Sequence, residues 1–121
     1  MELLNHAEPN QIVFVDKDKI IWVITNLLTN AIKYSPGNTK VELNTQFENG
    51  KLKIEISDQG SSIEDKYRQR IFERYFKIPG NPNSGTGLGL SICKEFMEAQ
   101  GGTIGVENNV SGIGSTFFIE V

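Results

Sequence analysis

The chain has 121 residues, of which 38% are hydrophobic, which is enough for one compact core and too little for two. Its 12 basic and 15 acidic residues include no basic run, which argues against nucleic acid as a partner. A single cysteine, Cys93, excludes a disulfide framework and fits a reducing, cytoplasmic setting. No apolar stretch reaches the roughly 20 residues of a membrane-spanning helix, so we expect no membrane contact by this chain, although its parent could be membrane-bound.

The first predicted elements are a strand and a long helix. β-branched and aromatic residues at 11–15 predict a strand, with a shorter one before Asn5. Asp16 or Asp18 can cap the helix that follows. This helix ends at residues 35–37, because proline cannot continue it and glycine readily takes the left-handed cap. Its predicted buried face consists of Ile20, Ile24, Leu27, Leu28 and Ala31.

The middle of the chain predicts a hairpin and a second helix. Two alternating segments, 41–47 and 52–56, are joined across Asn49 and Gly50, a strong signal for a tight hairpin. Residues 61–64 can form a capping box that starts a helix from Glu64 to about Tyr75. Residues 79–85 are rich in glycine, proline and asparagine and predict a mobile loop.

The last third predicts a helix and a second pair of strands. The helix runs from about residue 88 to 99, and strands follow at 103–107 and 116–121. Strands outnumber crossover connections, so we expect an α+β fold, a two-layer α/β sandwich. Its mixed, mostly antiparallel sheet would carry helices packed on one face. The residues of the last helix expected to point inward are Leu88, Ile92, Phe96 and Ala99.

A ridge of polar side chains on the first helix predicts a ligand site. Asn26, Asn30 and Lys33 follow the i, i+4, i+7 spacing of one helix face. Amide oxygens suit Mg²⁺ in company with phosphates, and a lysine suits the phosphates themselves. Glycines at 85, 87 and 89 match neither the phosphate-loop nor the dinucleotide pattern, but they can bring backbone N–H groups to an anion. Taken singly, a solvated helix face and a loop end explain these residues as well.

Four segments, in order, resemble the sequence boxes of bacterial sensor histidine kinases. Residues 26–35 resemble the N box, 58–63 the G1 box, 72–77 the F box and 85–90 the G2 box. On this resemblance, residues 1–121 are identified as a histidine kinase catalytic, ATP-binding domain. Its superfamily includes gyrase, the ninety-kilodalton heat-shock chaperone and the mismatch-repair ATPases. The resemblance implies the Bergerat-type ATP-binding fold and the cofactors ATP and Mg²⁺.

The resemblance also implies a role for each matched residue. Asn30 would be the main Mg²⁺ ligand, assisted by Asn26, and Tyr34 would pack on the adenine or ribose. Asp58 would accept a hydrogen bond from the adenine amino group, which selects adenine over guanine. Thr116 would support Asp58 through water. The other implied contacts with the nucleotide are Lys33, Gly60, Ile63, Phe76, Gly85, Thr86, Gly87, Leu88 and Gly89.

The implied catalytic set is Asn26, Lys33, Arg74 and Lys77, with the last two as candidates for the γ-phosphate. Asn26 cannot act as a general base, which disfavours hydrolysis. We therefore expect phosphoryl transfer to a histidine on a separate dimerisation domain, for relay to a response regulator. The sole histidine, His6, is followed by alanine and not by the acidic residue of an acceptor site. The chain should thus lack that domain, be a monomer when isolated and fail to autophosphorylate.

Ser62 stands where the G1 box normally has its second glycine. If this position needs a positive φ, serine costs roughly 1 kcal/mol and weakens nucleotide binding. In the other interpretation, which we favour, Ser62 caps the helix that follows. Ser62 therefore leaves a nucleotide-blind interaction module open as an alternative. A hydrolytic ATPase of the same superfamily is a second alternative, which Asn26 disfavours.

Overall fold

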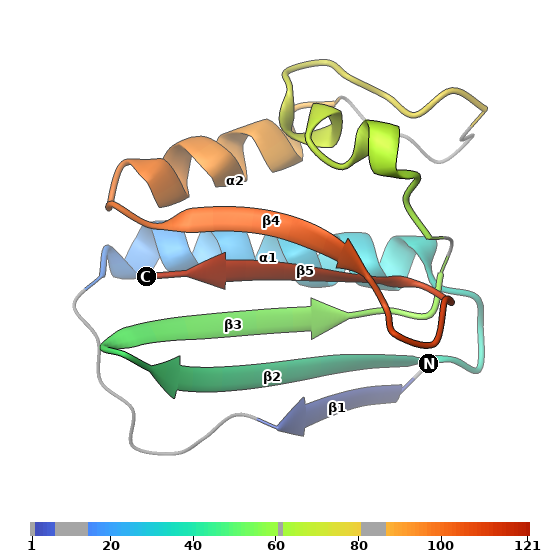
Figure 1. Cartoon of the computed structure of the whole chain (residues 1–121), viewed down its shortest axis with the longest axis horizontal. Helices are drawn as coiled ribbons and strands as arrows, with labels where there is room; N and C mark the ends of the chain where they lie inside the picture. Colours follow the sequence, from blue (N-terminus) through green and yellow to red (C-terminus); the bar gives the residue numbers. More distant parts are fainter. Residues whose placement is uncertain (1, 7–14, 61, 81–86) are drawn as a thin grey trace.

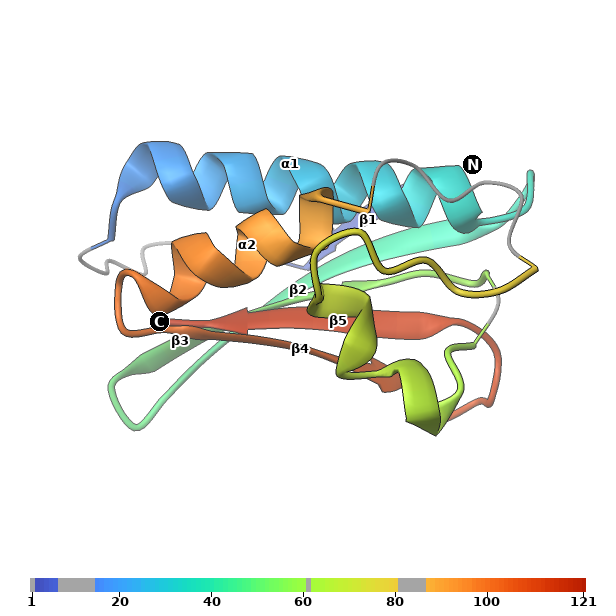
Figure 2. The ribbon, with the colours of Figure 1, turned by 90° about the horizontal axis from the view of Figure 1, so that it is seen from above.

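The computed structural model of the chain describes residues 2–6, 15–60, 62–80 and 87–121. A five-stranded sheet, in the order β1-β2-β3-β5-β4, carries two α-helices on one face (Figures 1 and 2). β1 pairs with β2 in parallel, and all other neighbours pair antiparallel, which confirms the expected mixed sheet and sandwich. The strands are β1 (Glu2–His6), β2 (Lys40–Glu48), β3 (Lys51–Ser57), β4 (Thr103–Asn108) and β5 (Ser115–Glu120).

The first helix, α1, spans Lys17–Tyr34, with Asp16 as its cap: Oδ1 of Asp16 accepts from the Lys19 N–H at 3.2 Å. The buried face is centred on Val23, Leu27 and Ala31, whereas the predicted Ile20, Ile24 and Leu28 are only partly buried. The face is thus rotated from the predicted one toward the ridge of amides. Apart from Val15, the strand predicted before this helix lies outside the described residues.

β2 and β3 form the predicted hairpin. Asn49 and Gly50 have φ values of 55° and 75°, and positive φ at both turn positions is what a two-residue hairpin of this hand requires. Leu43 pairs with Ile56, and side chains alternate along β3, so that Ile54 and Ile56 are buried under the helices. The hairpin therefore follows from local signals in the sequence.

The helix predicted from Glu64 to about Tyr75 is wrong. Two 3₁₀ turns, η1 (Asp65–Tyr67) and η2 (Arg70–Phe72), take its place. Ile71 and Phe72 are both buried, and the Phe72 ring meets Phe117 edge-on at 6.4 Å. Tyr75 has φ 63°, which an α-helix cannot include. The segment therefore forms tight turns and no α-helix, because two consecutive side chains are buried and Tyr75 has a positive φ.

The second helix, α2, spans Gly89–Glu98, close to its predicted bounds. Its inward face differs: Cys93 and Met97 are fully buried, while the predicted Ala99 is exposed. α2 packs between α1 and β4, so two sides of it are covered, and the Trp22 and Phe96 rings meet edge-on at 5.2 Å across α1 and α2. In the described part of the chain, no helix is both long and apolar enough to span a bilayer.

Candidate functional site

Asp58 directly follows β3 and is only 5% exposed. Its Oδ1 accepts from the backbone N–H groups of Gly60 at 2.9 Å and Ser115 at 3.3 Å. Burial raises the pKa of this carboxyl, and the two backbone bonds act in the opposite direction. Among the described residues no hydrogen bond engages Oδ2 of Asp58. The site thus offers one fixed carboxylate with an oxygen left for a donor.

The loop that follows β3 is called the Asp58 loop and comprises residues 58–60 and 62. At Gly60 it comes against the C-terminal end of α1. A Cβ atom on Gly60 would overlap the Tyr34 carbonyl and come within 3.3 Å of Asp58 Oδ1, so only glycine fits. Tyr34 is partly buried, which raises its pKa, and Nζ of the exposed Lys33 lies 5.4 Å from its ring centroid. Three predicted site residues, Tyr34, Asp58 and Gly60, are therefore neighbours.

The start of α2 lies beside the amide ridge of α1. A Cβ atom on Gly89 would come within 2.8 Å of Asn26 Oδ1. Asn26 and Asn30 are both partly buried. Within the described ranges, no hydrogen bond engages either carboxamide. The amide of Asn26 thus lies next to a helix N-terminus, and Asn30 follows one turn later on the same helix, an arrangement suited to a cation and its anionic partner.

The F-box segment supports the segment that leads into α2. Gly87 has φ 78°, and its carbonyl accepts from the Tyr75 N–H at 2.7 Å. A Cβ atom on Gly87 would come within 2.7 Å of Tyr75 Cα, so glycine is needed here for close approach as well as for φ. Leu88 is partly buried. The Phe76 ring contacts that of Tyr67 in a tilted arrangement, with 5.7 Å between the ring centroids, and its centroid lies 4.4 Å from the Arg70 guanidinium. The predicted site residues Gly85 and Thr86, and loop residues 81–84, lie outside the described residues.

The predicted cationic residues Arg74 and Lys77 are both exposed but differ in their contacts. Arg74 donates from Nη2 to Glu95 Oε1 at 2.5 Å and from Nε at 3.2 Å, and this partner raises its pKa. Lys77 is exposed and forms no ion pair within the described segments. In this state Arg74 is therefore bound to α2 and not presented to a phosphate.

The register of β3 and β5 distinguishes Ser115 from Thr116. Ser57 pairs with Thr116, which places Ser115 level with Asp58, on the buried face of the sheet. Oγ1 of Thr116 lies 2.7 Å from Ser57 Oγ and donates to Asn109 Oδ1 at 2.6 Å. Thr116 is thus linked to Asp58 through Asn109, whose Nδ2 donates to the Asp58 carbonyl at 2.8 Å.

Two residues of the site, Ser115 and Asn109, were missed from the sequence. Ser115 could have been found from strand alternation, because it shares the inward face with Phe117. Asn109 could not, because its contact depends on the conformation of the turn between β4 and β5.

Ser62 does not cap a helix, so that expectation is wrong. The N-cap of η1 is Glu64, and it forms no side-chain capping bond. Ser62 Oγ donates instead to the Gly112 carbonyl at 3.0 Å. Its φ is not positive, so the serine is not strained in the way that the glycine pattern suggests. The next residue, Ile63, donates its N–H to Asn108 Oδ1 at 3.0 Å.

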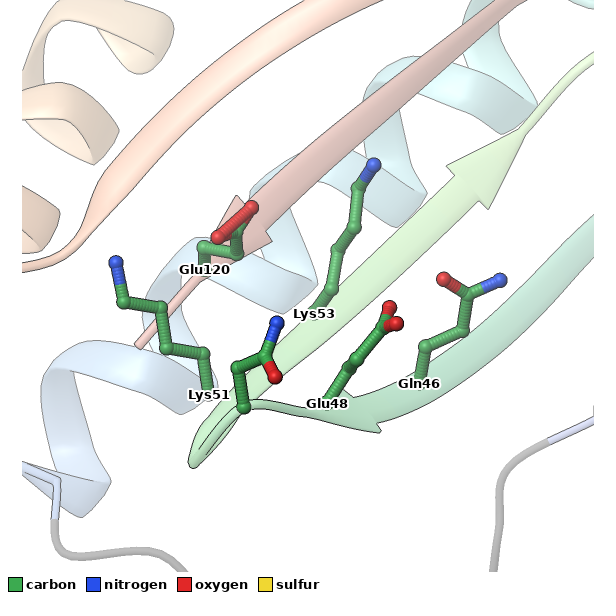
Figure 3. A pocket seen from close by; sticks show the side chains of 6 residues that line it. Gln46, Glu48, Lys51, Lys53 and Glu120 are labelled. Carbon is green, nitrogen blue, oxygen red and sulfur yellow. The ribbon is translucent and has the colours of Figure 1, made fainter.

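A shallow hollow of about 300 Å³ lies elsewhere, on the face of the sheet away from the helices (Figure 3). It is at the β2–β3 hairpin, the opposite end of β3 from Asp58, and none of the predicted site residues lines it. Side chains of both charges surround it, as on a solvated surface. Its lining consists of Gln46, Glu48, Asn49, Lys51, Lys53 and Glu120.

Known proteins are similar to this chain in sequence and in fold. Residues 15–121 match the family described as histidine kinase-, DNA gyrase B-, and HSP90-like ATPase. The swarming motility regulation sensor protein RssA of Serratia marcescens is 30% identical over 122 residues, which cover 100% of this chain and 26% of RssA. The catalytic domain of histidine kinase ThkA superposes with a TM-score of 0.86 at 28% identity, covering 99% of this chain and 78% of that one.

A structure of ThkA in complex with the response regulator protein TrrA also matches, with a TM-score of 0.81 at 26% identity over 98% of this chain and 33% of ThkA. This chain therefore spans about a quarter to a third of these longer proteins. The matched region contains the amide ridge, Asp58 and the segment before α2. The chain belongs to the histidine kinase-, DNA gyrase B-, and HSP90-like ATPase family, within which it is an ATP-binding catalytic domain of the sensor histidine kinase type.

Proposed function

We propose that this chain binds ATP with Mg²⁺ and donates the γ-phosphoryl group to a histidine on a separate dimerisation domain, for relay to a response regulator. The observation that carries the proposal is that two distant segments meet one helix. The Asp58 loop lies against Tyr34, and the start of α2 lies against Asn26, eight residues earlier. That separation is about 12 Å along the helix axis, a span suited to one nucleoside triphosphate.

The base end of the nucleotide is assigned to Asp58. An ionised carboxylate can only accept hydrogen bonds, and Oδ2 is the oxygen left for the adenine amino group. The carbonyl that guanine carries at the same position would meet a second acceptor. Because Gly60 has no Cβ, the loop lies close against Tyr34, and a base could lie beside this residue. Recognition at this end should therefore favour ATP over GTP.

The metal end is assigned to Asn30 as the main Mg²⁺ ligand, with Asn26 assisting the metal or its water. Their carboxamide oxygens are of the type that Mg²⁺ takes together with phosphates, and glycine at 89 leaves the space beside Asn26 Oδ1 that a Cβ would fill. When bound, Mg²⁺ would neutralise charge on the phosphate oxygens. Lys33 adds a positive charge on the same ridge, and Lys77 and Arg74 are further candidates for the γ-phosphate.

The amide of Asn26 favours transfer over hydrolysis. It cannot take a proton from water, so ATP would persist until an imidazole nitrogen attacks the γ-phosphorus and the bond to the ADP oxygen breaks. The chain's own residues then contribute position and charge neutralisation, which suffice for a largely dissociative transfer. We also propose that the domain works in the cytoplasm, where ATP is supplied, and that it is a monomer when isolated.

Calorimetric titration with a non-hydrolysable ATP analogue and Mg²⁺ tests the proposal. Asp58→Asn and Asn30→Ala should each lower affinity by about tenfold or more, from the loss of a hydrogen bond to a charged group or of a metal ligand. Asp18→Asn, on the exposed first turn of α1, is the control and should bind like the wild type. Absence of binding at millimolar analogue would favour a nucleotide-blind module. Steady-state ATP hydrolysis would favour a hydrolytic ATPase.

A further inference from the structure

The turn between β4 and β5, residues 109–114, is tied to the Asp58 loop by side chains of both segments. Ser62 Oγ donates to the Gly112 carbonyl at 3.0 Å and lies 3.4 Å from the Gly114 carbonyl. Ser62 is exposed and does not cap η1, so the structural role of its hydroxyl is this contact with the turn. A glycine at position 62 could not form this bond.

Asn109 ties the same turn to Asp58 from the other side. One N–H of its amide donates to the Asp58 carbonyl and the other to the Ile113 carbonyl, each at 2.8 Å. Its Oδ1 accepts from the Thr116 hydroxyl at 2.6 Å. Both amide hydrogens and the amide oxygen are therefore used to hold the turn in one conformation next to Asp58.

The turn lies directly on the residue that is to recognise the base. Gly114 has φ 82°, and a Cβ atom there would overlap the Asp58 carbonyl. The residue after it, Ser115, donates its N–H to Asp58 Oδ1 at 3.3 Å. A displacement of the turn would thus move the donor that fixes Oδ1 and, with it, the direction of Oδ2.

We propose that Ser62 is a positioning residue for nucleotide recognition: its hydroxyl holds turn 109–114 against the Asp58 loop, so that the free carboxylate oxygen of Asp58 is directed at the base. The inference rests on the proposed function, because it concerns the same Asp58. The serine then compensates for the missing second glycine of the G1 box by anchoring the loop to the neighbouring turn.

The test is calorimetric binding of the Mg²⁺-bound ATP analogue to Ser62→Ala, Ser62→Thr and the Ser111→Ala control. Ser111 lies in the same turn, and among the described residues its hydroxyl forms hydrogen bonds with Ile113 of that turn alone. Ser62→Ala should weaken binding by about threefold to tenfold, the range expected for one neutral hydrogen bond. Ser62→Thr, which keeps the hydroxyl, should recover most of the affinity, and Ser111→Ala should bind like the wild type.

Two further readouts separate positioning from a general loss of stability. The amide proton resonances of Gly60 and Ser115 should shift in Ser62→Ala and return in Ser62→Thr, because both N–H groups bind Asp58. In an Asp58→Asn background, Ser62→Ala should cause no further loss of affinity. Unchanged affinity of Ser62→Ala, or an equal loss in both backgrounds, would overturn the proposal.

The same data distinguish failure of this inference from failure of the proposed function. If Asp58→Asn weakens binding while Ser62→Ala does not, the assignment of Ser62 fails and the adenine site stands. If Asp58→Asn itself binds the analogue as well as the wild type, both are overturned.

Discussion

Gly89, the first residue of α2, faces Asn26 so closely that a Cβ atom on it would lie 2.8 Å from Asn26 Oδ1. Because the crowded atom is the end of a side chain, Gly89→Ala should turn the amide aside and leave the backbone in place. We expect the free energy of unfolding to be unchanged or raised by up to about 1 kcal/mol, since alanine favours helix. Affinity for the Mg²⁺-bound ATP analogue should fall about tenfold, as when a metal ligand is misoriented.

Gly37→Ala is the control for this substitution, because nothing lies within 4 Å of a Cβ atom at that position. It should change neither stability nor affinity. If Gly89→Ala lowers stability and leaves nucleotide affinity intact, the contact is structural only and Asn26 is not a ligand.

Alanine substitutions at two glycines with the same φ can separate the cost of backbone strain from the cost of a steric clash. Gly112 and Gly114 both have φ 82°, but a Cβ atom meets nothing at Gly112 and overlaps the Asp58 carbonyl at Gly114. Gly112→Ala should cost about 1 kcal/mol in urea unfolding, the usual cost of a positive φ. Gly114→Ala should cost a further 1–3 kcal/mol or so, because the backbone must move. Equal losses would contradict the close approach of the turn to Asp58.

The pKa of Asp58 predicts a trade between stability and recognition. Burial raises this pKa above its ordinary value of 3.8, so the folded state holds the proton more tightly than the unfolded state. Stability contributed by the protonated form is therefore lost as pH rises from the unfolded pKa through the folded pKa. Asp58→Asn avoids this loss and keeps an acceptor for Gly60 and Ser115.

We therefore expect Asp58→Asn to be more stable than the wild type at pH 7, with the difference shrinking below about pH 4. Urea unfolding measured from pH 3 to pH 8 checks the sign. A wild type that is the more stable protein at pH 7 would show that the hydrogen bonds outweigh burial at this carboxyl.

The ion pair of Arg74 with Glu95 predicts opposite effects of two substitutions. The side chains are 64% and 52% exposed, so Glu95→Gln should change the free energy of unfolding very little. It would release Arg74, and if Arg74 meets phosphate, ATP affinity should rise in Glu95→Gln and fall in Arg74→Ala. Glu98→Gln, which removes the Lys94 partner on the same helix, is the control and should leave affinity unchanged. The idea fails if Arg74→Ala binds ATP normally.

Elements set by local signals were predictable. The cap at Asp16 and the turn at Asn49 and Gly50 depend on the chemistry of one or two residues, and both appear where predicted. The segment from 64 to 75 was not, because its conformation depends on distant partners. Burial of Phe72 against Phe117 and the contact of residue 75 with residue 87 are invisible to helical periodicity.

The candidate site shows the same division. The convergence of the Asp58 loop and the start of α2 on α1 fits the order of the motifs, whereas the choice between Ser115 and Thr116 required the strand register. The partner of Ser62 lies 50 residues downstream, so no local reading of the sequence could have found it. The sequence predicts that Ser62 caps the following helix, which is a local contact, whereas in the structure its hydroxyl binds the distant Gly112 carbonyl.

Trp22 is the only tryptophan of the chain, and its ring rests edge-on against Phe96 of α2. Its fluorescence is therefore an intrinsic probe of how the two helices fit together. Because α2 begins beside Asn26, a ligand that shifts the start of this helix should change the tryptophan emission. Binding could then be titrated by intrinsic fluorescence, without a label.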